Sequence, residues 1–257
     1  MTQPLLSVIV PSYKTPELTK ICLRLLRSRT DCSKIRIIVI DNDSQDESVA
    51  YLKKLEWITF VQRQVPEGEA GFVMHAKALD EAFKLVTTPF VMIMHTDTFI
   101  LRSDWLDYIC GSFSSPEIAA VGSWKLEAPR SLLFRAAHAA ESWFRRLFRK
   151  NVKTEIRYLR SHCAVYRTEL VRRYTDGFYD GESAGKAMHL KLEQAGFRLL
   201  FLPSDELGKF ICHLNHATMI LNPGDHDRKT GKAPARNKLG KKIRMFREIL
   251  NRPDLDF

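Results

Sequence analysis

The alternation of short apolar runs with helix-like segments through the first hundred residues is the feature that most constrains the fold. Four runs, rich in β-branched residues, are typical of buried strands: residues 6–10, 35–40, 58–61 and 90–94. Segments with helical character separate them, at residues 16–28, 47–55 and 76–86. Because strands that alternate with helices form βαβ crossovers, the pattern predicts an α/β fold with a mostly parallel central sheet and helices on both faces.

Three of these strands end in polar clusters. The clusters are Ser12 and Tyr13 after the first strand, Asp41 and Asn42 after the second, and His95, Thr96 and Asp97 after the fourth. Ligands of such sheets bind beyond the carboxyl ends of the strands. Aspartate, asparagine and serine also favour loops and helix caps whatever they bind. Three clusters at equivalent ends of one sheet nevertheless predict a nucleotide-type site.

The second half of the chain is less regular. Strands are expected at residues 118–122, 161–166 and 199–202, and helices at 130–147, 186–195 and near 241–250. The helix at 130–147 ends among lysines, arginines and aromatic residues. Cations complement the dipole at a helix C-terminus, which fits a core helix with a solvated basic end. The same composition fits an interfacial membrane segment, and the sequence leaves both interpretations open.

Charge divides the chain into two unlike halves. The 257 residues carry a formal charge of +10. Residues 1–128 hold 14 lysines and arginines against 16 aspartates and glutamates, whereas residues 129–257 hold 26 against 14. A basic half favours an anionic partner, and nucleic acid is one such partner. No zinc-finger or RNA-recognition signature accompanies the charge, so we expect no nucleic acid.

Composition and cysteine usage exclude several classes of protein. Hydrophobic residues make up 45% and charged residues 27%, which excludes a disordered chain or a disulfide-stapled miniprotein. No apolar run approaches the roughly 20 residues of a membrane-spanning helix. The N-terminal residues lack the features of a secretory leader. The five cysteines are scattered without a CxxC pair, which suits a reducing cytosol and structural thiols.

Four segments carry a family resemblance. They are LSVIVPSYK, IIVIDNDSQDES, FVMIMHTDTFILRSDWL and EQAGFRLLFLP, spread in order over residues 5–203. Together they resemble the family 2 glycosyltransferases of GT-A fold. The resemblance implies a Rossmann-like GT-A domain at residues 1–215, with a donor-nucleotide half at 1–128 and an acceptor half at 129–215. A basic helical C-terminal extension would follow at 216–257.

By the same resemblance, several residues would form the donor site. Asp41 would accept hydrogen bonds from the base, Tyr13 could stack on it, and Asn42 would shape the loop; Pro11 and Ser12 would complete the pocket wall. Lys77 stands where the family usually has asparagine. A lysine there could pair with a phosphate, or it could be a solvated helix residue.

The resemblance also implies a metal site. Negative charge builds on a nucleoside diphosphate as it leaves, and a divalent cation stabilises that charge. Asp97 corresponds to the last Asp of the family's Asp-x-Asp motif, and His95 stands where the first Asp is usual. Carboxylates suit Mg²⁺ or Mn²⁺, and imidazole suits the manganese end of the series. His213 and His216 are further candidates, because relatives often carry a late histidine that reaches the metal or diphosphate.

The base is the hardest residue to place. An inverting transferase needs a carboxylate opposite the leaving group to take the proton of the acceptor hydroxyl. The family's usual acidic pair would align with Ala184 and Gly185, which cannot act as a base. Glu182 is our first candidate and Asp180 our second, although both could cap the helix that follows.

These expectations describe a metal-dependent, inverting glycosyltransferase of the hexosyltransferase type. Its donor would be a nucleoside-diphosphate sugar of UDP or dTDP type, its acceptor a glycan or lipid-linked glycan, and its setting bacterial surface polysaccharide assembly. We expect a cytoplasmic protein that is peripheral on the inner, anionic face of the membrane. The alternatives are a nucleic-acid-binding protein and a sugar-phosphate nucleotidyltransferase, though VPSYKTPE lacks the glycines of a nucleotidyltransferase loop.

Overall fold

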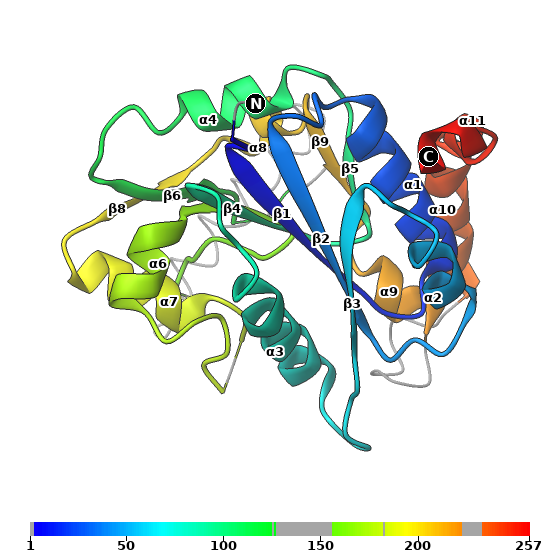
Figure 1. Ribbon diagram of the computed structural model, residues 1–257, viewed down its shortest axis with the longest axis horizontal. Coiled ribbons are helices and arrows are strands. Elements are labelled where there is room, and N and C mark those ends of the chain that lie inside the picture. Colours follow the sequence, from blue (N-terminus) through cyan, green and yellow to red (C-terminus); the bar gives the residue numbers. More distant parts are fainter. Residues whose placement is uncertain (1–2, 125, 127–155, 182, 223–232) are drawn as a thin grey trace, which may run out of the picture.

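A seven-stranded sheet forms the centre of the computed structural model, which describes residues 3–124, 126, 156–181, 183–222 and 233–257 (Figure 1). Its strands are β1 (Leu6–Ser12), β2 (Ile35–Asn42), β3 (Ile58–Arg63), β4 (Phe90–Met94), β6 (Ile118–Gly122), β7 (Cys163–Arg167) and β8 (Arg198–Phe201). Two further strands, β5 (Thr98–Ile100) and β9 (Ile211–His213), form a second sheet. The helices are α1 (Pro16–Ser28), α2 (Glu47–Leu52), α3 (Gly71–Phe83), α4 (Trp105–Gly111), α6 (Thr168–Tyr174), α7 (Lys186–Gln194), α8 (Ser204–Leu207), α9 (Ala217–Leu221), α10 (Ala233–Arg244), α11 (Arg247–Leu250) and the 3-10 helix η2 (Pro253–Asp256).

The sheet is mostly parallel, as the sequence predicts. Its strand order is β3-β2-β1-β4-β7-β6-β8. β1 pairs in parallel with both β2 and β4, and β2 pairs in parallel with β3. β7 runs antiparallel to its neighbours β4 and β6. The register pairs Ser12 with Asp41, so the polar clusters that follow β1 and β2 lie at the same edge of the sheet.

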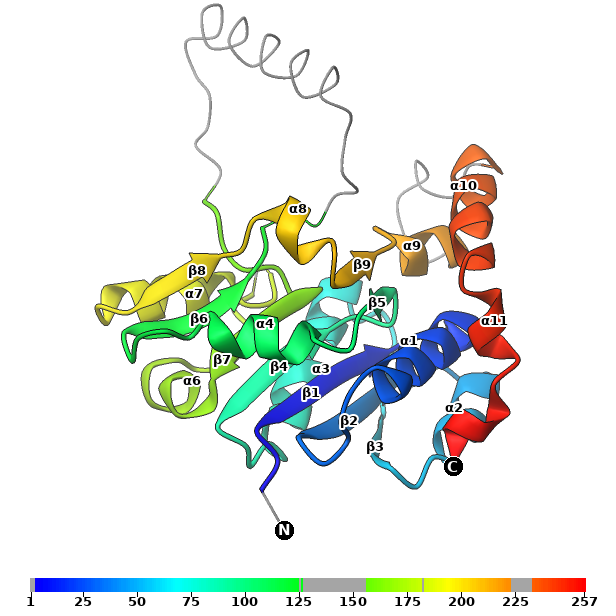
Figure 2. The ribbon, with the colours of Figure 1, turned by 90° about the horizontal axis from the view of Figure 1, so that it is seen from above.

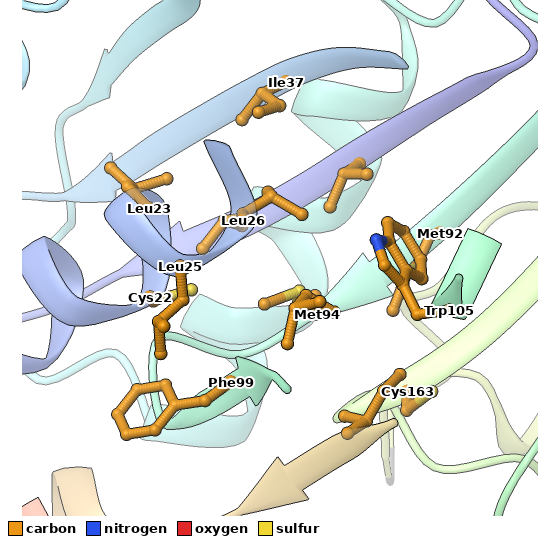
Figure 3. Close-up of a cluster of buried hydrophobic side chains, with 14 of the residues drawn as sticks. Cys22, Leu23, Leu25, Leu26, Ile37, Met92, Met94, Phe99, Trp105 and Cys163 are labelled. Atoms are coloured by element: carbon orange, nitrogen blue, oxygen red, sulfur yellow. The ribbon is translucent and has the colours of Figure 1, made fainter. Parts of the chain in front are cut away.

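Helices cover both faces of the sheet, and side chains alternate between two cores. Val8 and Val10 of β1 join a cluster with residues of α1 and α4, including Trp105, whereas Ile9 joins a cluster with residues of α3, α6 and α7. Figure 3 shows the first cluster, where Trp105 lies beside Met92. Nearly continuous apolar strands are expected for a sheet buried on both faces, so the predicted fold class is confirmed.

Two predicted helices have different bounds. α3 begins at Gly71 rather than at residue 76, and its N-cap Ala70 supplies no side-chain cap, so the sequence carries no start signal there. The prediction of a single helix near 241–250 is wrong: α10 begins at Ala233, and the helical conformation is interrupted before α11 begins at Arg247. Phe246 at the break packs edge-on against Phe99, 4.8 Å between ring centroids. The helix expected at 130–147 lies outside the described residues.

A second, two-stranded sheet brings residues 211–213 beside the segment that follows β4. β5 pairs antiparallel with β9, and Thr98 lies opposite His213. Farther on, α11 lies beside α1, as Figures 1 and 2 show from two directions. In the part of the chain that the structure describes, no helix has both the length and the apolar character to cross a membrane.

Candidate active site

A cleft of about 1630 Å³ opens at the carboxyl ends of β1, β2 and β4. All three predicted polar clusters contribute to its lining, through Ser12 and Tyr13, Asn42, and His95 with Asp97. Late segments of the chain close another side, through His213 and His216 and through two lysines of α10, Lys238 and Lys242. The cleft therefore joins the strand-end clusters with residues more than a hundred positions away.

Strained backbone conformations concentrate at this cleft. Among the described residues, the non-glycine residues with positive φ are Lys14, Asp43, Gln45, Asn215 and His216. Every one of them lines the cleft. The left-handed region costs free energy for residues other than glycine and persists where the surrounding structure enforces it, typically at ligand sites. The loops after β1, β2 and β9 are thus held in shapes that local preference alone does not favour.

Three potential metal ligands converge on one side of the cleft. The ligand atoms of His95, Asp97 and His213 all lie within 4.8 Å of one another. His213 Nε2 is 3.2 Å from Asp97 Oδ1, and His95 Nδ1 is 3.8 Å from the same oxygen. The strand pairing of β5 with β9 produces this meeting, because it places His213 beside the segment that follows Asp97.

The opposite edges of these side chains are held by other groups. His95 Nε2 lies 3.0 Å from Ser161 Oγ, and Asp97 Oδ2 accepts a hydrogen bond of 3.2 Å from the Ala217 backbone N–H. Within the described residues, Asp97 Oδ1 and His213 Nδ1 are buried without a hydrogen-bond partner. Because buried polar atoms are nearly always satisfied in folded proteins, an unsatisfied oxygen among imidazoles indicates a missing ligand. The donor set therefore fits a divalent cation.

Two histidines outside the predicted set complete the cluster. The His162 ring stacks on His213 with 4.4 Å between centroids, and its Nε2 lies 2.8 Å from Ser123 Oγ. The His75 ring meets His95 edge-on at 4.9 Å. Sequence reasoning missed both as site residues. His162 lies just before β7 and its place beside the parallel strands depends on an antiparallel pairing that no sequence pattern announced.

The electrostatics keep the imidazoles of His75, His95 and His162 neutral and the Asp97 carboxylate charged. Burial lowers the pKa of His75 to about 4 and that of His162 to about 3. Burial and then the neighbouring histidines hold the pKa of His95 well below its usual value. Burial raises the pKa of Asp97, but the nearby His213 and His95 imidazoles and the Ala217 N–H outweigh it and hold that pKa below its usual range. Both states suit metal coordination, because metals bind deprotonated ligands.

The predicted base-binding residue Asp41 lies just behind the cleft wall. Its side chain is fully buried, and Ser44 donates to it through both the hydroxyl and the backbone N–H. The Lys14 backbone N–H in turn donates to Ser44 Oγ at 3.0 Å. Asp41 thus ties the loops after β1 and β2 together, while its neighbours Asn42 and Asp43 face the cleft.

Lys77 lies away from the cleft lining. Its ammonium donates to Glu69 Oε1 at 2.7 Å, and Arg63 holds the other oxygen of Glu69 at 2.8 Å. Glu69 lines the cleft, whereas 43% of the Lys77 side chain is exposed. Lys77 therefore supports the segment before α3 rather than projecting into the cleft.

The two candidates for the base differ in what the structure describes. Asp180 accepts backbone hydrogen bonds from Ser183 at 2.6 Å and from Ala187 at 2.8 Å, where α7 begins. This is a capping arrangement, and Asp180 is absent from the described cleft lining. Glu182 lies outside the described residues.

Solved structures show which proteins share this architecture. The mannosyltransferase PcManGT from Pyrobaculum calidifontis, in complex with GDP-Man and Mn²⁺, matches with a TM-score of 0.58 at 21% identity over 79% of this chain. Residues 1–349 of S. aureus TarS match with TM-scores of 0.52 in complex with UDP and 0.50 with UDP-GlcNAc, each at 18% identity over 77% of this chain. The chain spans 56–57% of these proteins' structures. The likeness confirms the predicted GT-A fold.

Sequence comparison gives the family itself. No curated protein sequence matches the chain significantly. Residues 7–175, which include β1 to β4 and both His95 and Asp97, match the family described as Glycosyl transferase family 2. The match covers well over half of the 257 residues, and the chain belongs to glycosyl transferase family 2.

Proposed function

We propose that the protein is a metal-dependent, inverting glycosyltransferase that moves a sugar from a nucleoside-diphosphate sugar to a hydroxyl of a glycan or lipid-linked glycan. The observation that carries the proposal is the convergence of His95, Asp97 and His213 at the strand ends, with a buried carboxylate oxygen that has no partner among the described residues. Family membership supports the reaction type.

Different residues of the cleft would contact the nucleotide, the cation and the phosphate groups. Pro11, Tyr13 and Asn42 at the ends of β1 and β2 provide a wall for the nucleotide. His95, Asp97 and His213 would hold a divalent cation, which would act as a Lewis acid toward the departing diphosphate. Lys14, Arg160, Lys238 and Lys242 also line the cleft and supply positive charge for phosphate oxygens.

The ligands bound in the similar solved structures indicate which nucleotide sugars should be tested as donors. PcManGT was solved with GDP-Man and Mn²⁺, and TarS with UDP-GlcNAc. The sequence led us to expect a UDP or dTDP donor. A guanine nucleotide belongs in the panel as well, because neither neighbour is similar enough in sequence to decide the base.

Glu182 is the proposed base, and the Asp180 cap supports this order of preference. The Asp180 carboxylate is engaged by the backbone N–H groups of Ser183 and Ala187 at the start of α7. The proton of the acceptor hydroxyl would pass to Glu182 as the oxygen attacks the anomeric carbon. Asp180 stays the alternative base.

The proposed acceptor is inferred from the charge of the second half of the chain. The excess of cations in residues 129–257 suits an anionic acceptor such as a lipid diphosphate-linked glycan, and it suits peripheral binding to an anionic inner leaflet. Bacterial surface polysaccharide assembly is the setting we propose. Flotation with anionic liposomes at low salt tests the membrane part, since binding is expected there and its absence would restrict the acceptor to soluble anions.

The decisive experiment is a panel of GDP, UDP and dTDP sugars, screened for Mn²⁺-dependent hydrolysis and for transfer. We expect turnover of one donor that chelation abolishes. Glu182→Gln should retain donor binding and lose transfer. Asp180→Asn is the matched variant, because asparagine still caps a helix; loss of transfer in Asp180→Asn alone would make Asp180 the base. Absence of turnover and of nucleotide binding across the panel would contradict the proposed function.

A further inference from the structure

The donor set of the cleft differs in chemical character from an all-oxygen site. Two of its three protein ligands are imidazole nitrogens, from His95 and His213, and one is the Asp97 carboxylate. Mg²⁺ and Ca²⁺ prefer oxygen ligands, whereas divalent ions of the later first transition series bind imidazole strongly. A site with this set of ligands therefore discriminates between divalent ions.

The contacts assign the ligating atom of each side chain. Ser161 occupies His95 Nε2, which leaves Nδ1 directed toward Asp97. The Ala217 N–H occupies Asp97 Oδ2, which leaves Oδ1. His213 presents Nε2 to that same oxygen at 3.2 Å. One atom from each residue, His95 Nδ1, Asp97 Oδ1 and His213 Nε2, thus faces a common point.

Surrounding groups fix these ligands before any ion binds. The Asp97 and His213 side chains are only 5% and 10% exposed. The His162 ring lies parallel to His213 at 4.4 Å and is itself bonded to Ser123, so His213 has little room to rotate. Partners that orient metal-binding side chains contribute strongly to affinity and to selectivity. Three protein ligands also leave coordination positions for ligand oxygens.

We propose that this site is selective for transition ions, binding Zn²⁺ and Co²⁺ most tightly, Mn²⁺ less tightly and Mg²⁺ weakly, and that His95 sets the preference. The proposal rests on the metal centre of the proposed function and adds which ion class that centre takes. Exchanging His95 for aspartate replaces one of the two imidazole nitrogens by a carboxylate oxygen and so removes the feature that produces the selectivity.

Direct metal binding tests the proposal without any turnover. Chelator-treated, dialysed protein is titrated with Co²⁺, and the visible absorption of the bound ion is followed. We expect saturation at one equivalent, displacement by Zn²⁺ and by Mn²⁺ at higher concentration, and resistance to Mg²⁺ at concentrations at least about tenfold above effective Mn²⁺. Displacement by Mg²⁺ as readily as by Mn²⁺ would overturn the proposal.

Variants separate the ligands from their surroundings. His95→Asp should weaken Co²⁺ binding by roughly tenfold or more and let Mg²⁺ compete. Ser161→Ala, which keeps all three ligands, should weaken Co²⁺ binding about tenfold. His216→Ala is the control, because His216 lines the cleft but lies outside the cluster; loss of Co²⁺ binding in that variant would overturn the ligand assignment.

The outcomes also distinguish this proposal from the broader one. Nucleotide-sugar transfer supported equally by Mg²⁺ and Mn²⁺ would overturn the selectivity and leave the transferase intact. Selective Co²⁺ binding without any nucleotide binding would leave the metal site intact and contradict the transferase. Circular dichroism of each variant confirms that a loss of binding is not a loss of folding.

Discussion

Two buried charged clusters in this protein differ in how completely their polar atoms are paired. In the first, Arg24 donates to both oxygens of Asp256, from Nε at 2.8 Å and from Nη2 at 2.5 Å. Arg24 Nη1 donates to two carbonyls of α11, and the Tyr51 hydroxyl donates to Asp256 at 2.8 Å. The Arg24 and Asp256 side chains are only 6% and 14% exposed. This cluster is internally satisfied.

The second cluster, around Asp97, is equally buried but incompletely paired. Asp97 Oδ1 and His213 Nδ1 lack hydrogen-bond partners among the described residues, although His213 Nε2 approaches that oxygen. A satisfied buried network stabilises one conformation, whereas an unsatisfied one carries a free-energy cost that a ligand can remove. The comparison teaches that burial and charge alone do not mark a binding site, while unpaired ligand atoms do.

The end of the chain connects the first cluster to the cleft that contains the second. The Arg24 cluster anchors the residues after α10 against α1, and Trp57 adds a bond from its ring N–H to the Asp256 carbonyl at 3.1 Å. α10 contributes Lys238 and Lys242 to the cleft. The structural cluster therefore holds one wall of the cavity in which the other cluster lies.

The largest effect should come from Asp97→Asn. Removing the carboxylate should lower transfer by about 10²- to 10³-fold, because several kcal/mol of leaving-group stabilisation depend on the cation. The metal-free variant should lose only modest stability, since the Ala217 N–H and the nearby imidazoles hold the Asp97 charge while one of its oxygens stays unpaired. Transfer assays and metal-free thermal unfolding measure the two effects. A strong loss of stability would make Asp97 a structural residue like Asp256.

Arg24→Met should act in the opposite sense. Breaking this buried pair should cost about 3–5 kcal/mol of unfolding free energy, because Asp256 keeps its charge without its cation. Denaturant unfolding measures this, and Co²⁺ binding to the folded variant should persist. Arg252→Met is the matched control on the same segment: its pair with Asp254 is more than half exposed and screened by solvent, so its removal should change the unfolding free energy little. An equal loss of unfolding free energy in Arg24→Met and Arg252→Met would contradict the distinction between the buried and the exposed pair.

Acid should weaken the satisfied cluster as Asp256 becomes protonated. Burial raises the pKa of Asp256, but hydrogen bonds from Arg24 and Tyr51 and the Arg24 charge outweigh burial and lower it below the ordinary value. A depressed folded-state pKa contributes stability that is present above about pH 4 and is lost as pH falls further. Wild-type unfolding free energy should therefore fall more steeply below that pH than in Asp256→Asn, by at most about 1.4 kcal/mol per pH unit. If the unfolding free energies of wild type and Asp256→Asn fell in parallel with pH, Asp256 would not be the group that makes the protein sensitive to acid.

The smallest effect should come from Asp180→Ala at the start of α7. Asp180 is a carboxylate like Asp256, and two backbone N–H groups, those of Ser183 and Ala187, donate to it. Losing such a cap typically costs about 1 kcal/mol. Urea unfolding of Asp180→Ala beside Asp180→Asn isolates the cap, because asparagine retains an acceptor oxygen. No difference between these variants would argue against capping.

Local patterns in the sequence predicted the parallel half of the molecule. Buried strands reveal themselves as continuous apolar runs, so β1, β2 and β4 and the residues at their ends were accessible without a structure. The pairing of β5 with β9 was not, because three-residue strands carry no periodicity. For the same reason the neighbours of His213 could not be derived, and only the family resemblance suggested that it reaches the metal.

Local contacts engage two of the predicted donor-site residues. Asp41 is expected to accept hydrogen bonds from the base, and its carboxylate accepts two hydrogen bonds from Ser44; its contact with a nucleotide stays a prediction. Lys77 could pair with a phosphate or be a solvated helix residue, and in the structure it donates to Glu69. Each residue type in these positions suits either role, and only the three-dimensional arrangement of neighbours distinguishes them.

Binding of GDP and UDP in Mn²⁺ or in EDTA, compared between wild type and Asp97→Asn, tests the central claim most directly. Isothermal titration calorimetry should show wild-type binding of at least one nucleotide that weakens strongly on chelation, and a variant whose weaker binding is the same with and without Mn²⁺. An Asp97→Asn protein that keeps the full metal-dependent gain in affinity would contradict the assignment of this cluster as the metal centre of a nucleotide-dependent transferase.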